Sequence, residues 1–167
     1  MDEQIFSFTP ILSAQPKVLI LGTMPSATSL QKNEYYAFPG NVFWKIISAI
    51  KGIDCPTVYT EKRKLILEMD LALWDVCHTC IRPGSADSAI QKEEPNELKE
   101  LLDAYPSIRA ILFNGKTAEK LFHKHFMKME GVQLFVMPST SPAYTLSFEK
   151  KLKIWQESLI AHLVSPK

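Results

Sequence analysis

Four short polar segments of this chain combine residue types that could recognise a flat heterocycle. They cover residues 22–26, 75–82, 114–116 and 138–144, and each follows an apolar run. A fifth stretch, 35–41, adds three aromatic rings. For any one segment, turn formation is about as good an explanation as ligand binding, because Gly, Pro, Ser and Asn are turn residues. All five together favour a pocket of aromatic faces, amides and hydroxyls, which suits a nucleobase.

Apolar runs alternate with helical patterns, and this order predicts the elements that position the polar segments. Runs at 17–22, 71–76, 110–115 and 132–138 predict four buried strands. Helical spacing predicts helices over 42–50, 59–69, 96–105, 117–129 and 147–163, with Asn41 as the N-cap of the first. We therefore expect an α/β fold, a three-layer α/β/α sandwich with a central four-stranded parallel sheet. Ligands of such sheets bind outside the carboxyl ends of the strands, where the four segments would meet.

Composition and charge narrow the class of protein. The 167 residues are 46% hydrophobic and 22% charged, which is typical of one globular domain. Nineteen basic residues against 18 acidic ones give a net charge of +1, so a polybasic arm is excluded. The chain starts with acidic residues and has only three cysteines. No apolar run approaches the roughly 20 residues that a membrane span needs. These features predict a cytoplasmic protein with no membrane partner.

Several familiar site types lack their motifs. The first strand is not followed by G-x-G-x-x-G, and the chain has neither G-x-x-x-x-G-K-[ST] nor G-x-S-x-G. Cys77 and Cys80 have C-x-x-C spacing, and Cys55, His123 and His125 could join them. A zinc site usually needs a second spaced pair, so we expect no bound metal.

The ordered set of motifs resembles the uracil-DNA glycosylase superfamily. The motifs are Gly22-Thr23-Met24-Pro25-Ser26, Tyr35-Tyr36-Ala37-Phe38-Pro39-x-Asn41-x-Phe43-Trp44 and Ser139-Thr140-Ser141-Pro142-Ala143. The spacing from the first loop to Asn-x-Phe-Trp is similar to that of the mismatch-specific branch. Trp74-Asp75-Val76 and Arg82-Pro83-Gly84-Ser85 are more narrowly similar to the DNA-deoxyinosine (hypoxanthine-DNA) glycosylase branch. Since the resemblance covers roughly 17–160, we expect residues 1–167 to form a single domain of this kind.

The resemblance implies a monofunctional enzyme of DNA repair. Such an enzyme flips a deaminated base, here hypoxanthine, out of DNA and hydrolyses its N-glycosidic bond to leave an abasic site. No lysine lies in a motif that suggests a Schiff base, so strand cleavage is not expected. The implied partner is DNA containing deaminated bases, the implied cofactor is none, and we expect a monomer.

The resemblance also implies roles for individual residues. Many relatives carry Asn or Asp where this chain has Met24, and a thioether cannot polarise water. The catalytic residue that holds the water would therefore be Asn41. The alternative is that Asn41 acts as a helix cap alone. Tyr36 would stack on the base, while Phe38 replaces a His of many relatives. The expected base-binding residues are Gly22, Thr23, Met24, Pro25, Ser26, Tyr36, Asp75 and Asn114. The expected DNA-binding residues are Lys116, Ser139, Thr140, Ser141, Pro142, Ala143 and Tyr144, with Tyr144 as the preferred wedge.

Three other functions stay open at this point. One is a mismatch-specific uracil or thymine glycosylase, against which Met24 argues. Another is a catalytically silent module that recognises damaged bases with the same pocket. The third is a hydrolase of free nucleosides with no DNA partner, whose binding would be insensitive to salt.

Overall fold

The main sheet is five-stranded and mixed. In the computed structural model, which describes residues 3–163, its strand order is β2-β4-β3-β7-β8. Strands β3 (Val18–Gly22), β4 (Leu71–Asp75), β7 (Ala110–Asn114) and β8 (Gln133–Met137) pair in parallel. The two-residue strand β2 (Ile11–Leu12) pairs antiparallel with β4. The predicted α/β fold is confirmed, and the expected four-stranded parallel sheet is corrected, because β2 extends it at one edge.

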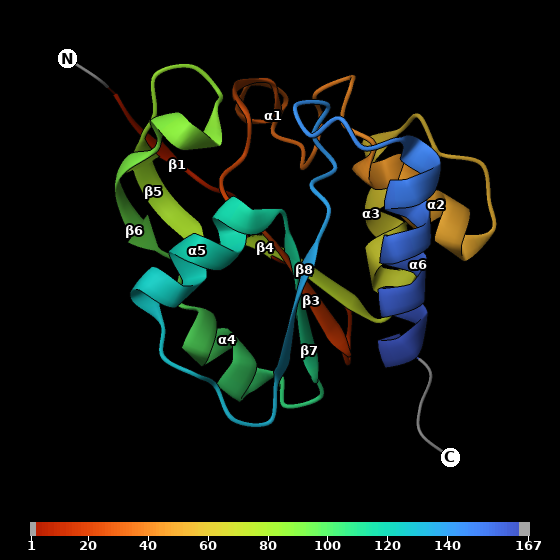
Figure 1. Cartoon of the computed structure of the whole chain (residues 1–167). Helices are drawn as coiled ribbons and strands as arrows, with labels where there is room; N and C mark the ends of the chain where they lie inside the picture. Colours follow the sequence, from red (N-terminus) through yellow and green to blue (C-terminus); the bar gives the residue numbers. More distant parts are fainter. Residues whose placement is uncertain (1–2, 164–167) are drawn as a thin grey trace.

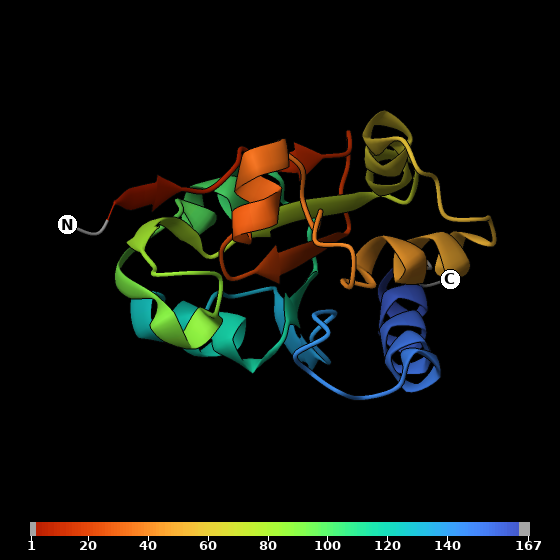
Figure 2. The ribbon, with the colours of Figure 1, turned by 90° about the horizontal axis from the view of Figure 1, so that it is seen from above.

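Helices cover both faces of this sheet, as Figures 1 and 2 show. Helices α2 (Phe43–Lys51), α3 (Tyr59–Glu68) and α6 (Phe148–Leu163) share one apolar cluster with Ile20 and Leu112. Helices α4 (Leu98–Ala104) and α5 (Lys116–His125) share another with Leu21 and Phe113. The switch of face at each step along β3 and β7 follows from the two-residue period of a strand. Both strands are buried throughout, which explains their continuous apolar sequences.

A second sheet and a short helix were not predicted from the sequence. Strands β1 (Gln4–Phe6), β5 (Cys77–Ile81) and β6 (Gln91–Pro95) form an antiparallel sheet in the order β1-β5-β6. Only Val76 separates β4 from β5, so the segment expected as a loop over 75–82 is mostly strand. Helix α1 (Ala27–Lys32) follows the first polar segment, and a 3-10 turn (Asp87–Ala89) precedes β6. Within the described part of the chain, no helix has the length and apolar character that crossing a membrane requires.

Candidate active site

The site is organised by three residues at the carboxyl ends of neighbouring strands. Gly22 ends β3 and pairs in register with Asp75, which ends β4. Leu21 pairs with Phe113, so Asn114 follows at the end of β7 on the other side of Gly22. These three residues occupy the positions whose side chains point toward the α2, α3 and α6 face. Because glycine has no side chain, a gap opens over Gly22 between Asp75 and Asn114.

Tyr36 reaches into this gap. A Cβ atom added to Gly22 would lie 2.8 Å from Tyr36 Oη and 2.5 Å from Asp75 Oδ1. The Tyr36 ring stacks on Phe43 with centroids 4.1 Å apart and planes 29° apart. Its backbone has a φ of 54°, a left-handed conformation that costs a non-glycine residue free energy. The fold therefore holds this ring in one strained and closely packed position.

Two buried polar atoms at this point have no hydrogen-bond partner among the described residues. They are Tyr36 Oη and Asp75 Oδ2. Burial and then the charge of Asp87 together raise the pKa of Asp75 to about 7, against the opposing charge of Arg82. Burial, and then the charge of Asp75, likewise raises the pKa of Tyr36. Near neutral pH the Asp75 carboxyl is thus divided between an acid that can donate a hydrogen bond and a carboxylate that can only accept.

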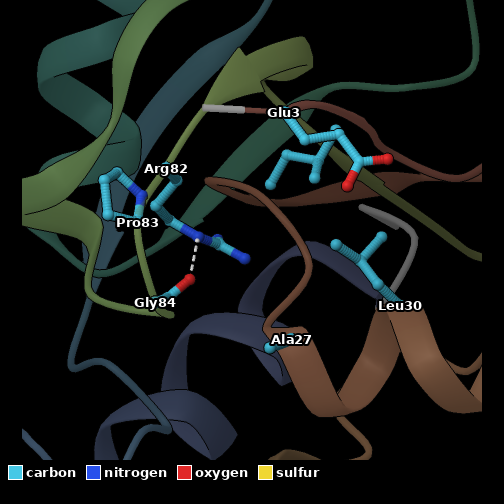
Figure 3. A pocket seen from close by; sticks show the side chains of 7 residues that line it. Glu3, Ala27, Leu30, Arg82, Pro83 and Gly84 are labelled. Atoms are coloured by element: carbon cyan, nitrogen blue, oxygen red, sulfur yellow. Dashed lines mark hydrogen bonds between the residues drawn. The ribbon is translucent and has the colours of Figure 1, made fainter. Parts of the chain in front are cut away.

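The first polar loop, 22–26, is held by the segment that precedes β6. Buried Arg82 donates from Nη2 to the carbonyl oxygen of Pro25 at 2.7 Å. Thr23 Oγ1 donates to Asp87 Oδ2 at 3.2 Å. A pocket of about 300 Å³ lies beside Arg82 and is lined by residues of β1, α1 and the 82–84 turn (Figure 3). Within this turn, Arg82 Nε donates to the Gly84 carbonyl oxygen. The pocket includes none of the three strand-end residues, so it is separate from the candidate site.

The side chains of the first loop are occupied by packing and capping. Met24 is 7% exposed and packs against Cys77 and Cys80. Ser26 is the N-cap of α1 and accepts a hydrogen bond from the Ser29 amide. Neither side chain presents a polar group to the strand-end residues, so the contribution of this loop rests on its backbone and on Thr23.

Asn114 is joined to the last polar loop by a reciprocal pair of hydrogen bonds. Its Nδ2 donates to Thr140 Oγ1, and its Oδ1 accepts from the Thr140 amide, both at 2.9 Å. The Thr140 carbonyl oxygen accepts from the Val42 amide at 3.0 Å. One chain of contacts therefore connects the end of β7, the last loop and the start of α2. Thr140 thus uses one donor and one acceptor of the Asn114 amide. The same amide lies near the Tyr36 hydroxyl and opposes the rise in the Tyr36 pKa.

Asn41 precedes Val42, the N-cap residue of α2. Its Oδ1 accepts a hydrogen bond from the Phe43 amide at 2.9 Å, although the N-cap position itself is taken by Val42, one residue later than expected. A Cβ atom on the preceding Gly40 would lie 3.1 Å from Pro142 Cγ. Both chain neighbours of Asn41 thus lie beside the last loop. The Asn41 amide oxygen is fixed in direction and has one lone pair remaining.

The last loop presents its tip to solvent. Ser139 Oγ accepts from the Ser141 amide, and Ser141 Oγ accepts from the Ala143 amide, both at 3.2 Å. Pro142, Ala143 and Tyr144 are exposed. In Figure 1 this loop lies at the same edge of the molecule as α1. Exposed Lys116 opens α5 directly after Gly115, where a Cβ atom would lie 3.2 Å from Ser139 Cβ.

One buried charged residue of this region escaped the sequence analysis. Lys151 is 3% exposed and contacts the last loop from α6. The spacing of Lys151 to Trp155 and Leu159, at i, i+4 and i+8, places it on the apolar stripe of the helix, and this signal was available in the sequence. Cys77 and Cys80 are buried thiols whose pKa values are raised by burial. Across residues 3–163, no group of three or more His, Cys, Asp or Glu side chains is arranged to hold a metal ion.

Comparison with known proteins agrees with this architecture. The family model of the uracil DNA glycosylase superfamily matches residues 9–160. Two curated relatives are named hypoxanthine DNA glycosylase. The one from Methanosarcina barkeri is 30% identical, over 90% of this chain and 95% of its own length. The one from Methanosarcina acetivorans is 33% identical, over 93% and 97%.

A more distant relative and a solved structure extend the comparison. A G/U mismatch-specific uracil DNA glycosylase of Schizosaccharomyces pombe is 27% identical, over 84% of this chain and 49% of its own length. The solution NMR structure of a Methanosarcina acetivorans protein superposes with a TM-score of 0.80 at 32% identity, covering 96% of this chain and 99% of the other. The chain belongs to the uracil DNA glycosylase superfamily.

Proposed function

We propose that this protein is a monofunctional DNA repair glycosylase that removes a deaminated base, with hypoxanthine in deoxyinosine as the preferred substrate. One observation carries the proposal. A single edge of the sheet brings together the Tyr36 ring, the Asn114 amide and the buried Asp75 carboxyl, and the last loop connects them to Asn41. The names of the two relatives from Methanosarcina support hypoxanthine as the base.

Base recognition is assigned to the strand-end residues and the first loop. With Phe43 against one face of Tyr36, the extruded base would stack on the other face, which is worth roughly 1 to 3 kcal/mol per base. The second N–H of Asn114, the acid form of Asp75 and the backbone N–H groups of Thr23, Met24 and Ser26 would donate to the oxygen and nitrogen atoms of the purine edge. Fixed donors stabilise the negative charge that the base gains as it leaves.

Hydrolysis is assigned to Asn41 and a water molecule. The bond from the anomeric carbon to the base breaks, its electron pair goes to the base, and the sugar becomes an oxocarbenium ion. The remaining lone pair of Asn41 Oδ1 would accept a hydrogen bond from the water and hold it beside that carbon. The water oxygen forms the new bond, and the proton it loses neutralises the base. The products are the free base and an abasic site, and the strand stays intact.

The last loop and Lys116 are assigned to DNA. Hydroxyls of Ser139 and Ser141 would contact phosphates together with Lys116, while exposed Tyr144 would enter the base stack. These contacts need only local positive charge, which is compatible with the net charge of +1. The single-domain organisation over 1–167, the monomeric state and the cytoplasmic location remain predictions.

Oligonucleotide cleavage tests this proposal. Single-turnover reactions use duplexes with deoxyinosine, deoxyuridine, deoxyxanthosine or a G·T mismatch, followed by alkali to cut abasic sites. We expect the largest rate with deoxyinosine and no cut strand before alkali. Release of uracil or thymine alone would support the mismatch-specific function instead. Binding without release would indicate a silent recognition module, and release from free deoxyinosine would indicate a nucleoside hydrolase.

A further inference from the structure

Lys151 is a lysine in an unusual environment. It lies in the first turn of α6, is 3% exposed, and occupies the stripe that Trp155 and Leu159 continue into the core. A buried ammonium group costs free energy unless it has partners. Among the described residues, no carboxylate lies within ion-pair distance of its Nζ. Burial accordingly lowers the pKa of Lys151.

Both contacts of the Lys151 ammonium are made to the last loop. Nζ donates a hydrogen bond to the Ser141 carbonyl oxygen at 3.0 Å. It also lies 5.5 Å from the centroid of the Tyr144 ring, within the range of a cation–π interaction. The same Ser141 oxygen accepts from the Tyr144 amide at 3.1 Å. The Lys151 ammonium therefore contacts both the backbone of the turn, at Ser141, and the ring of Tyr144 that the turn carries.

The rest of the loop is held independently of Lys151. Thr140 is fixed to Asn114, and Pro142 packs against Gly40. Tyr144 has neither support, and its side chain is 48% exposed. An unsupported aromatic side chain at a loop tip loses conformational freedom when it binds, and a contact that orders it beforehand removes part of that cost.

We infer that Lys151 is a positioning residue that orders the 141–144 turn and aims the Tyr144 ring at the DNA base stack. The inference rests on the proposed function, because it requires this loop to meet DNA. Lys151 acts through Tyr144 and does not itself touch the reacting atoms. It follows that the effects of replacing Lys151 and Tyr144 are coupled.

A double-mutant cycle on a deoxyinosine duplex tests the inference. The variants are Lys151→Met, Tyr144→Ala and the pair together, and Lys153→Met replaces an exposed lysine of the same helix as a control. We expect Lys151→Met to lower kcat/KM about tenfold, as the loss of a cation–π contact and a charged hydrogen bond predicts. The double variant should be no less active than the less active of the two single variants. Lys151→Arg, which keeps a cation over the ring, should recover part of the activity.

Fluorescence of 2-aminopurine beside the lesion gives a readout that requires no hydrolysis. Unstacking raises its emission, and we expect a smaller rise with Lys151→Met than with the wild type or Lys153→Met. Wild-type kinetics and fluorescence for Lys151→Met, or strictly additive losses in the double variant, would overturn the inference. Wild-type protein that unstacks 2-aminopurine but releases no base would contradict the proposed hydrolysis, and a smaller fluorescence rise with Lys151→Met would still support the role of Lys151. Wild-type protein that does not bind the duplex would overturn both.

A further variant covers the case in which Lys151→Met does not fold. Tyr144→Leu replaces an exposed side chain, keeps an apolar wedge and removes the aromatic ring near the ammonium. We expect a lower rise of 2-aminopurine fluorescence than in the wild type. An unchanged rise would show that the ring contact with Lys151 has no role in positioning.

Discussion

The Asn41 side chain has two roles that one substitution removes together. Its Oδ1 supports the start of α2 and is proposed to hold the water. Asn41→Ala should lose roughly 100-fold in turnover through loss of water positioning. It should also lose about 1 kcal/mol of stability with the hydrogen bond to the Phe43 amide. Single-turnover cleavage and urea unfolding measure the two effects separately.

Asn41→Asp is the matched variant for this experiment. A carboxylate oxygen can still accept from the Phe43 amide and from a water, so stability and much of the turnover should be kept. Duplex binding should persist in both variants, since neither removes a DNA-facing side chain. Wild-type turnover in Asn41→Ala would remove this residue from the mechanism.

Asp75 should make the stability of the protein depend on pH. Its folded pKa of about 7 lies above the ordinary value of 3.8, so the folded state holds its proton more tightly than the unfolded state. The resulting stability is fully present below pH 3.8 and is lost as the pH rises toward and through 7, by roughly 4 kcal/mol. Asp75→Asn cannot ionise and should abolish this part of the decline.

Urea unfolding from pH 4 to 8 checks the expectation for Asp75. The difference between the wild type and Asp75→Asn should grow in favour of the variant up to about pH 7 and then level off. Asp103→Asn replaces an exposed carboxylate on α4 and serves as the control. A pH-independent difference for Asp75→Asn would show that its carboxyl titrates alike in the folded and unfolded states.

At the scale of elements, strongly patterned segments could be predicted from the sequence. The parallel strands β3, β4, β7 and β8 are continuous apolar runs, and their predicted ranges differ from the observed ones by one residue at most at each end. Helices α2 to α6 were found within a few residues through their apolar spacing. The edge strand β2 has only two residues, too few for any period to show.

The rest of the architecture depends on contacts distant in sequence. Strand β5 reads as a polar loop because it carries Cys77, His78 and Thr79 and finds its partners in β1 and β6. The apolar runs placed the strand ends at 22, 76 and 115, so Gly22, Asp75 and Asn114 were correctly expected near the carboxyl ends of strands of one sheet. The left-handed backbone of Tyr36 and the approach of Asp87 to Thr23 come from tertiary packing, for which no local pattern exists.

The strand-end gap over Gly22 is an element-scale feature with its own test. Gly22→Ala would place a Cβ atom 2.8 Å from Tyr36 Oη and 2.5 Å from Asp75 Oδ1. Overpacking of this kind costs about 1 to 3 kcal/mol. Tyr36→Phe removes the unpartnered hydroxyl and should relieve part of the clash. The double variant should therefore be more stable than the sum of the single effects by on the order of 1 kcal/mol in urea unfolding. Additive effects would show that Tyr36 does not fill this gap.

At the scale of the whole molecule, a net charge of +1 means that the salt dependence of DNA binding must come from cations gathered at one edge. Each phosphate neutralised by a lysine or arginine contributes about 0.9 to the slope of log K against log salt. Exposed Lys116, beside the last loop, is the proposed cation at the edge that meets DNA. Lys116→Gln should weaken binding to all duplexes alike and reduce the magnitude of the slope by about 1. Lys99→Gln removes an equal charge at an exposed position of α4 and should leave the slope unchanged. Fluorescence anisotropy with an uncleavable duplex, between about 50 and 200 mM salt, gives both slopes. Equal reductions in the two variants would mean that total charge governs binding and would contradict a localised DNA-facing edge.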